Sequence, residues 1–283
     1  MPRAWRTAVD EQAGIPACHN GGMSRRTAIA GVAVALGAVL VATGAAASVA
    51  WTPSPSDRFQ LILSATPTAA QLRGSFNVME VDGFDTPAST VTALHALHKE
   101  AVCYIDVGTW EQWRPDAKRF PKSVLGKPDA GWPGERWLDI RQTGVLLPIM
   151  RARFAMCVKK RFDAVDPDNV DGVENATGFK LTVLEQLTYD RAIAALAHAD
   201  GLAVALKSYA DEAKALEPSF DFVVEEQCVK YSECGELASF PANHKPVFDI
   251  EYTRSLAFCA KLPAGMFGIA KHLSLDAWVR RCP

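Results

Sequence analysis

Residues 162–175 read FDAVDPDNVDGVEN, an apolar lead followed by acids and turn formers. The lead, 162–165, has the length of a short buried strand, and Pro167, Asn169 and Gly172 then end it and turn the chain. In parallel α/β folds the carboxyl end of a strand carries the functional site. An acidic turn with Asx caps is the alternative interpretation. The carboxylates placed at this end are Asp166, Asp168, Asp171 and Glu174.

The first 50 residues have the features of an export signal. Arg25 and Arg26 precede an uncharged run, 27–50, that is rich in Ala and Val and ends in small residues. We expect residues 1–50 to be a signal peptide or a membrane-anchor leader, with Met23 as an alternative start. Cleavage before Trp51 would secrete the protein, whereas an uncleaved leader is long enough to span a bilayer. Membrane association is expected only in the second case.

Residues 51–283 have the length of one large α/β domain. The leader contains four of the 30 basic residues and two of the 32 acids, which leaves 26 basic and 30 acidic residues and a net charge of −4. This charge argues against nucleic-acid binding. It suits a cationic ligand if the acids gather in one cleft. We expect a monomer.

Six cysteines remain after the leader, and an even number in an exported chain favours disulfides. Cys228–Cys234 would close a local loop, Cys259–Cys282 would hold the C-terminus, and Cys103–Cys157 is left by elimination. A zinc site is the alternative, but no two of these cysteines have C-x-x-C spacing.

Short apolar runs alternate with helical patterns from residue 58 onward, which implies parallel strands joined by right-handed crossovers. Eight strands in this length predict an α/β fold, a (β/α)₈ TIM barrel, rather than an open doubly wound sheet. No G-x-G-x-x-G follows the first strands, so a dinucleotide site is not indicated. The predicted strands are 59–63, 76–81, 101–105, 162–165, 202–206, 220–224, 246–250 and 266–270. The predicted helices are 90–100, 146–160, 181–199 and 275–281.

One long excursion, 108–143, interrupts this alternation and holds four of the seven tryptophans. An insertion of this length is usually functional. Exposed indoles beside carboxylates suit a sugar subsite, because the apolar face of a pyranose stacks on an indole. Ordinary loop packing explains the same residues equally well. The four are Trp110, Trp113, Trp132 and Trp137.

Acids or lysines stand at most predicted strand ends, and a barrel would bring these ends together at one mouth. Helix capping could account for one or two of them, Asp82 and Asp85 in particular. The set is Asp82, Asp85, Asp106, Asp166, Asp168, Lys207, Glu225, Glu226, Glu251 with Tyr252, and Lys271.

Paired carboxylates suit glycoside cleavage, in which one protonates the leaving oxygen while the other attacks C1 or activates water. Lys207 would lower the pKa of one acid. A divalent metal is the rival use of clustered acids. Because His95 and His98 lie on the first predicted helix, away from the mouth, we expect no metal and no cofactor. No G-x-S-x-G motif indicates acyl transfer.

Six ordered motifs resemble glycoside hydrolase family 114, typified by endo-α-1,4-polygalactosaminidases. They are CYIDVGT (103–109), RPD (114–116), WLDIR (137–141), DPDNVDG (166–172), EQC (226–228) and EY (251–252). The resemblance covers about Trp51 to Lys271 and implies a TIM-barrel endoglycosidase acting on α-1,4-linked galactosamine polymers. The sequence departs from the family pattern at two positions. Asp166 stands where the family often has Glu, and Ser208 stands where the family often has Asn.

The resemblance implies that Asp168 and Glu226 are the catalytic pair. We expect the mouth to attract a cationic amino-sugar polysaccharide, with a non-catalytic carbohydrate-binding barrel at the cell surface as the alternative. The predicted substrate-binding residues are Asp82, Asp106, Asp166, Asp171, Lys207, Glu251, Tyr252 and Trp110.

Overall fold

A computed structural model describes residues 51–283, and the predicted leader lies outside the described residues. The chain forms one nine-stranded sheet in which eight strands are parallel and the last, short strand is antiparallel. In sheet order the strands are β1 (Phe59–Ile62), β2 (Val78–Asp82), β3 (Glu100–Asp106), β7 (Ala164–Asp168), β8 (Ala203–Lys207), β9 (Phe222–Glu226), β10 (Val247–Glu251), β11 (Met266–Ala270) and β12 (Arg280–Arg281).

The sheet curls so that its first and later strands face each other. The rings of Phe59 on β1 and Phe248 on β10 stack with centroids 4.7 Å apart, although these strands are not neighbours in the sheet. Near the two edges, Leu63 N donates to Leu275 O, and Lys271 Nζ donates to Leu61 O. The result is an α/β fold with a curled parallel sheet, consistent with a TIM-like barrel.

Side-chain alternation divides the strands between two cores. Alternate residues such as Val78, Val102, Ala164 and Phe222 form an apolar cluster inside the curl. Their strand neighbours join a larger cluster with the helices outside. Continuing this alternation toward the carboxyl ends predicts which polar residues face inward.

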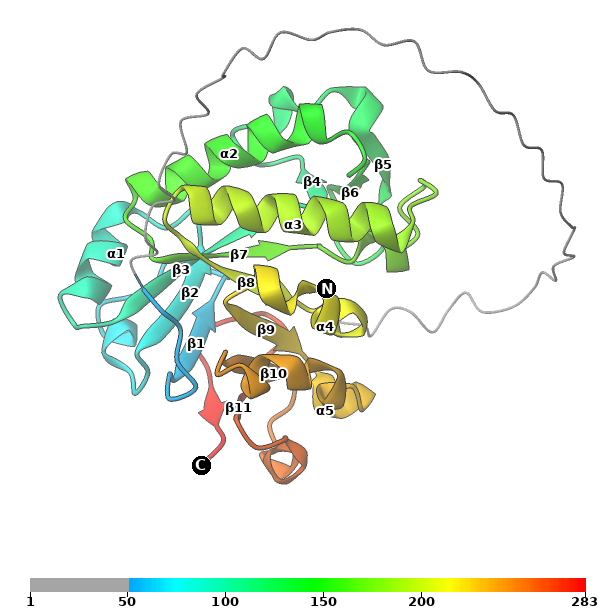
Figure 1. Cartoon of the computed structure of the whole chain (residues 1–283). Helices are drawn as coiled ribbons and strands as arrows, with labels where there is room; N and C mark the ends of the chain where they lie inside the picture. The colour runs from blue at the N-terminus through cyan, green and yellow to red at the C-terminus, as the bar shows by residue number, and fades with distance from the viewer. Residues whose placement is uncertain (1–50) are drawn as a thin grey trace, which may run out of the picture.

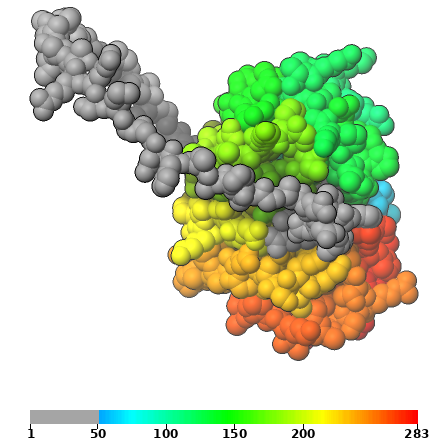
Figure 2. Space-filling model, turned by 90° about the vertical axis from the view of Figure 1, so that its right-hand side faces the viewer, coloured from blue at the N-terminus to red at the C-terminus, as the bar shows by residue number. Residues whose placement is uncertain are grey.

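Helices cover the outer face of the sheet. In Figure 1, α2 (Thr143–Lys159) and α3 (Val183–Ala199) run side by side over β7 and β8. Figure 2 shows the colours following one another from green through yellow to orange, so consecutive segments are spatial neighbours. The other helices are α1 (Ala88–His95), α4 (Ala213–Leu216), α5 (Cys228–Tyr231) and α6 (Ser239–Ala242).

The excursion after β3 folds into a second, small sheet with the order β4-β6-β5. Its strands are antiparallel, and β4 begins three residues after the carboxyl end of β3. The small sheet therefore stands beside the mouth of the curled sheet. Its strands are β4 (Thr109–Glu111), β5 (Leu125–Pro128) and β6 (Glu135–Leu138).

Two sequence-based predictions about elements are wrong. Residues 275–281 are not a helix: the chain passes through turns there and ends in β12, which pairs with β11. Most predicted strands are also displaced by one or two residues toward the N-terminus. The observed strands include the acids and Lys207 as their last residues, because the backbone of these residues continues the pairing between strands.

The structure joins the six cysteines as Cys103–Cys157, Cys228–Cys234 and Cys259–Cys282. The first links β3 to α2, the second lies at α5, and the third ties the C-terminal segment to the loop before β11.

Candidate active site

A buried ammonium group forms the centre of the site. Lys207, the last residue of β8, lies with its Nζ 3.2 Å from Asp168 Oδ1, 3.4 Å from Glu226 Oε1 and 4.0 Å from Asp166 Oδ2. Burial disfavours its charge, but Asp168 and Glu226 outweigh this and raise the pKa of Lys207 well above its ordinary value. The side chain is therefore a fixed cation shared by acids from neighbouring strands.

Asp168 is held as a carboxylate. The Tyr104 hydroxyl donates to its Oδ2 at 2.6 Å, and the backbone N–H of Asn169 donates to its Oδ1 at 2.9 Å. Burial alone would raise the pKa of Asp168, but the Lys207 charge and these hydrogen bonds hold it well below its usual range. This carboxylate is thus ionised at neutral pH and fixed in orientation.

Glu226 faces Asp168 across the ammonium group. Lys207 Nζ lies 3.2 Å from one carboxylate oxygen and 3.4 Å from the other, so these oxygens cannot be farther apart than the two distances together, about 6.6 Å. The other oxygen of Glu226, Oε2, is buried and receives no hydrogen bond from the described residues. Tyr252 is close enough that its pKa is raised well above normal, first by burial and then by Glu226.

Two fully buried carboxyls lie beneath this pair. Glu80 and Asp166 are both 0 % exposed, and their four oxygens receive no hydrogen bond from any other described residue. They bond to each other, which requires a proton on one of them. Burial raises the pKa of Glu80 well above its ordinary value and that of Asp166 to about 7.

The backbone turns sharply after each of the three central residues. Asn169, Ser208 and Gln227 directly follow Asp168, Lys207 and Glu226, and their φ angles are 62°, 42° and 66°. Non-glycine residues rarely adopt this left-handed conformation, and such residues are concentrated at functional sites.

A pocket of about 330 Å³ opens above these residues. Trp113 and Trp132 from the small-sheet excursion line it and are 51 % and 42 % exposed. The pocket is lined by Leu63, Ser64, Asp82, Asp85, Tyr104, Glu111, Trp113, Arg114, Trp132, Glu135, Asp168, Asn169, Lys207, Glu226, Tyr252, Leu273, Ser274 and Leu275.

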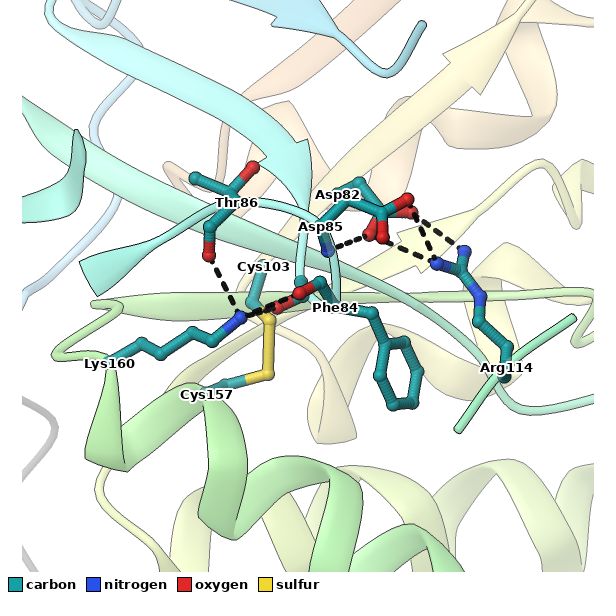
Figure 3. The surroundings of a disulfide bond; sticks show 9 residues. Asp82, Phe84, Asp85, Thr86, Cys103, Arg114, Cys157 and Lys160 are labelled. Atoms are coloured by element: carbon teal, nitrogen blue, oxygen red, sulfur yellow. Dashed lines mark hydrogen bonds and ion pairs between the residues drawn. A yellow bond between two sulfur atoms is a disulfide. The ribbon is translucent and has the colours of Figure 1, made fainter. Parts of the chain in front are cut away.

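Asp82 lies at the pocket wall under strong restraint. Arg114 binds both of its carboxylate oxygens, at 3.1 and 2.7 Å, and also approaches Asp85 (Figure 3). Lys160 fixes the loop after Asp82, because its Nζ donates hydrogen bonds to three carbonyl groups of that loop. The Cys103–Cys157 disulfide lies beside this loop (Figure 3). Asp82 therefore has less freedom to bind substrate than an unpaired acid would have.

Of the predicted substrate-binding residues, Asp82, Lys207 and Tyr252 line the pocket, as does the predicted catalytic pair. The remaining five lie outside the lining: Asp106, Asp166, Asp171, Glu251 and Trp110.

The hydrogen bonds of three of these five explain their positions. Asp106 accepts from the N–H groups of Gly108 and Thr109 and from Asn169 Nδ2, and so it fixes the turn beside Asp168. Glu251 is displaced by strand alternation to the outer face of the sheet, where it accepts from two N–H groups of α5. Trp110 donates its indole N–H to Ala117 O and packs on the outer core.

Asp171 is buried at the start of the turn 172–174, and Asp166 lies below the floor of the pocket. Sequence reasoning missed Glu80, Tyr104, Glu111 and Glu135. A period of two would have found the first two, since each stands two residues before a site acid on the same strand face.

Within residues 51–283 the group with metal-ligand spacing is His95, Glu100 and Asp163. It lies near the amino ends of β3 and β7, away from the pocket. His95 Nε2 lies 2.8 Å from Asp163 Oδ2, and His198 pairs with Asp221 at the same distance. Since Asp163 and Asp221 both accept from a strand N–H, these pairs serve as tethers between helix and strand.

An ionised carboxylate and a second carboxyl group flank one pocket at the carboxyl ends of a curled parallel sheet, an arrangement that suits a glycosidase. Comparisons with known proteins agree. The sequence profile of glycoside-hydrolase family GH114 matches residues 41–283, and the chain belongs to this family.

Solved structures include similar folds. Ega3 from Aspergillus fumigatus, in a complex with galactosamine, is 31 % identical, with a TM-score of 0.78 over 84 % of this chain and 100 % of that chain. The glycoside hydrolase domain of PelA from Pseudomonas aeruginosa shares the fold at 15 % identity, with a TM-score of 0.62 over 78 % of this chain and 97 % of that chain. No curated protein sequence matches this chain.

Proposed function

We propose that the protein is a secreted endoglycosidase that cleaves α-1,4-linked galactosamine in a polysaccharide, with Asp168 and Glu226 as the catalytic residues. The observation that carries this proposal is the placement of both carboxyl groups around Lys207 at the floor of one pocket. The similarity to Ega3, whose structure contains galactosamine, supports the substrate class. In this proposal the curled sheet functions as a closed (β/α)₈ barrel.

Asp168 is the nucleophile in this proposal because it is held ionised. One of its oxygens attacks C1, the bond from C1 to the leaving oxygen breaks, and Glu226 gives its proton to that oxygen. In the second step Glu226 takes a proton from water, the water oxygen attacks C1, and Asp168 leaves as a carboxylate. Glu226 lies beside Tyr252 at the pocket, where its carboxyl group can reach the leaving oxygen.

We propose that the reaction retains the configuration at C1, and the carboxyl separation is compatible with this. Retaining glycosidases hold their carboxyl groups about 5–5.5 Å apart, and inverting ones about 6.5–9.5 Å apart to admit a water molecule. The contacts with Lys207 limit the distance between Asp168 Oδ1 and Glu226 Oε1 to about 6.6 Å, which includes the retaining separation and lies at the lower end of the inverting range.

Lys207 and Tyr104 tune the nucleophile. Both stabilise the charged form of Asp168, and both must yield part of this interaction when the charge moves to the bond with C1. Lys207 also contacts Glu226, so it interacts with whichever carboxyl group carries the negative charge in each step.

The disulfide bonds of the protein are consistent with export from the cell. Three disulfides are characteristic of an oxidising compartment. Residues 51–283 include no helix long and apolar enough to cross a membrane. We propose that residues 1–50 direct secretion and that residues 51–283 are the catalytic domain, acting as a monomer.

The test measures reducing ends released from α-1,4-linked polygalactosamine by the purified protein, with EDTA present. We expect release by the parent and a loss of at least about a thousandfold in Asp168→Asn and Glu226→Gln, because each removes a group used in both steps. Far-ultraviolet circular dichroism checks that the variants are folded. Full activity of either variant, or dependence of the parent on a divalent cation, would overturn the proposed mechanism.

A further inference from the structure

Two glutamates of the small sheet stand directly opposite each other at the pocket. Glu111 on β4 pairs in register with Glu135 on β6, and both line the pocket while less than one-tenth exposed. Like charges directly opposite on neighbouring strands destabilise a sheet. Two ionised glutamates at these positions would therefore need a proton or a cation to offset their charge.

Glu135 differs from the other acids of the pocket in having no cationic partner. Asp82 and Glu111 are paired with Arg114, and Asp168 with Lys207. Among residues 51–283 no Lys, Arg or His nitrogen lies within 4.0 Å of the Glu135 carboxyl group. Its hydrogen-bond donor there is the Thr109 hydroxyl, at 3.0 Å from Oε2.

That hydroxyl cannot satisfy all of its acceptors. Thr109 Oγ1 also lies 2.6 Å from Asp106 Oδ2, and a hydroxyl carries a single hydrogen. One of the two contacts therefore requires a proton on a carboxyl group. Burial, reinforced by neighbouring acids, raises the pKa of Glu135 to about 9 and that of Asp106 to about 8. In the free protein a proton on one of these carboxyl groups neutralises its negative charge, and a bound cation could do so instead.

The second glutamate also has an unused acceptor. Glu111 Oε2 is buried and receives no hydrogen bond from the described residues, and Arg153 approaches it only to 4.0 Å. The charged groups that face the pair from the surrounding elements are Asp82, Asp106, Asp168, Arg114 and Arg153. Acids outnumber cations here.

Two tryptophans lie in the turns next to these strands. Glu135 N donates to Trp132 O, and Gly134, at φ 97°, lies so close to Trp113 that a side chain there would meet its ring at 2.9 Å. Trp113 and Trp132 thus flank the carboxyl pair with large exposed apolar faces.

We propose that Glu135, assisted by Glu111, binds the ammonium group of a free amino sugar, and that Trp113 and Trp132 contact the apolar face of its ring. This inference rests on the proposed function and adds the group that selects deacetylated over N-acetylated residues. An N-acetyl group is neutral and larger, and it would leave the carboxyl pair without a counter-charge.

The test titrates galactosamine and N-acetylgalactosamine into the purified protein and follows tryptophan fluorescence. The parent should bind galactosamine at least about tenfold more tightly, a difference of about 1.4 kcal/mol. Glu135→Gln keeps the side-chain shape but cannot release a proton to form the carboxylate that pairs with the ammonium group, and its two dissociation constants should agree within about twofold. Glu100→Gln removes the same charge at the far end of the sheet and should retain the parent preference.

A tenfold preference that survives in Glu135→Gln, or that is absent from the parent, would overturn this subsite. Hydrolysis of polygalactosamine by the parent tests the proposed function separately. A parent that cuts the polymer while Glu135→Gln keeps the preference leaves the function standing without the subsite. A parent that cuts no polymer while Glu135→Gln loses the preference leaves an amino-sugar binding site without the proposed activity.

Discussion

The ammonium nitrogen of Lys207 lies 3.2 Å from Asp168 Oδ1, and the two side chains are only 3 % and 10 % exposed. At this depth the acids around Lys207 can remain ionised only because its positive charge lies beside them. Removing one partner of a buried ion pair leaves uncompensated charge, which costs far more than a surface pair is worth.

Lys207→Met should therefore destabilise the protein by about 3–5 kcal/mol at pH 7. The deficit should shrink at pH 5, because the remaining carboxyls then take up protons whose binding Lys207 had opposed. Urea unfolding under non-reducing conditions at both pH values measures it. An equal deficit at pH 5 and pH 7 would show that Lys207 contributes packing and not charge.

Tyr104→Phe removes the hydroxyl that donates to Asp168 Oδ2 at 2.6 Å. This bond also fixes the orientation of the Asp168 carboxylate for attack on C1, and because its loss releases that orientation, kcat should fall by about tenfold to a hundredfold. Because this bond helps to hold the pKa of Asp168 low, the acid limb of the pH–rate profile should move to higher pH. A parallel loss of activity at every pH would mean that the hydroxyl only supports packing.

Glu80→Gln should be tolerated, because the glutamine amide can donate to Asp166 as the protonated carboxyl does. The raised pKa of Glu80 means that the folded protein holds a proton that the unfolded chain releases. The parent should therefore lose stability as pH rises from about 4.5 toward neutrality, by up to about 1.4 kcal/mol per pH unit.

Glu80→Gln should lack this loss, so its stability relative to the parent should grow between pH 4.5 and pH 7, as measured by denaturant midpoints. Parallel stability curves for parent and variant would show that Glu80 holds no extra proton. Glu80→Leu serves as the comparison, since it fills similar space but cannot donate to Asp166.

Ser208→Gly should stabilise the protein by about 0.5–1 kcal/mol. Ser208 has a φ of 42° directly after Lys207, a conformation that glycine adopts without strain. Ser208→Ala is the matched control, because it removes the hydroxyl and keeps the strained Cβ. Equal stability of the two variants would assign the effect to the hydroxyl.

The sequence predicts the parallel α/β sheet and places Asp168 and Glu226 at strand ends, where the structure has them. Eight apolar runs separated by helical patterns predicted the parallel sheet, and the run of acids around Asp168 marked a strand end. The observed strands reach one or two residues further along the chain. The sequence therefore predicts where the site residues lie along the chain better than it predicts the face of the sheet to which their side chains point.

Direction depends on the alternation of side chains, and this is where prediction failed. Glu251 and Glu226 both end strands, yet Glu226 faces the pocket while Glu251 caps α5 outside the sheet. The small sheet posed a different difficulty. Its pairing of Glu111 with Glu135 joins residues 24 positions apart through a turn whose register the sequence does not reveal.

The configuration of the newly released reducing end tests the central claim most directly. Proton NMR during the first minutes of polygalactosamine cleavage, before mutarotation, reports the anomer that the enzyme forms. Attack by Asp168 followed by attack of water inverts C1 twice, so the account predicts the α-anomer. Initial release of the β-anomer would mean a single displacement by water, and it would contradict the role of Asp168 as nucleophile.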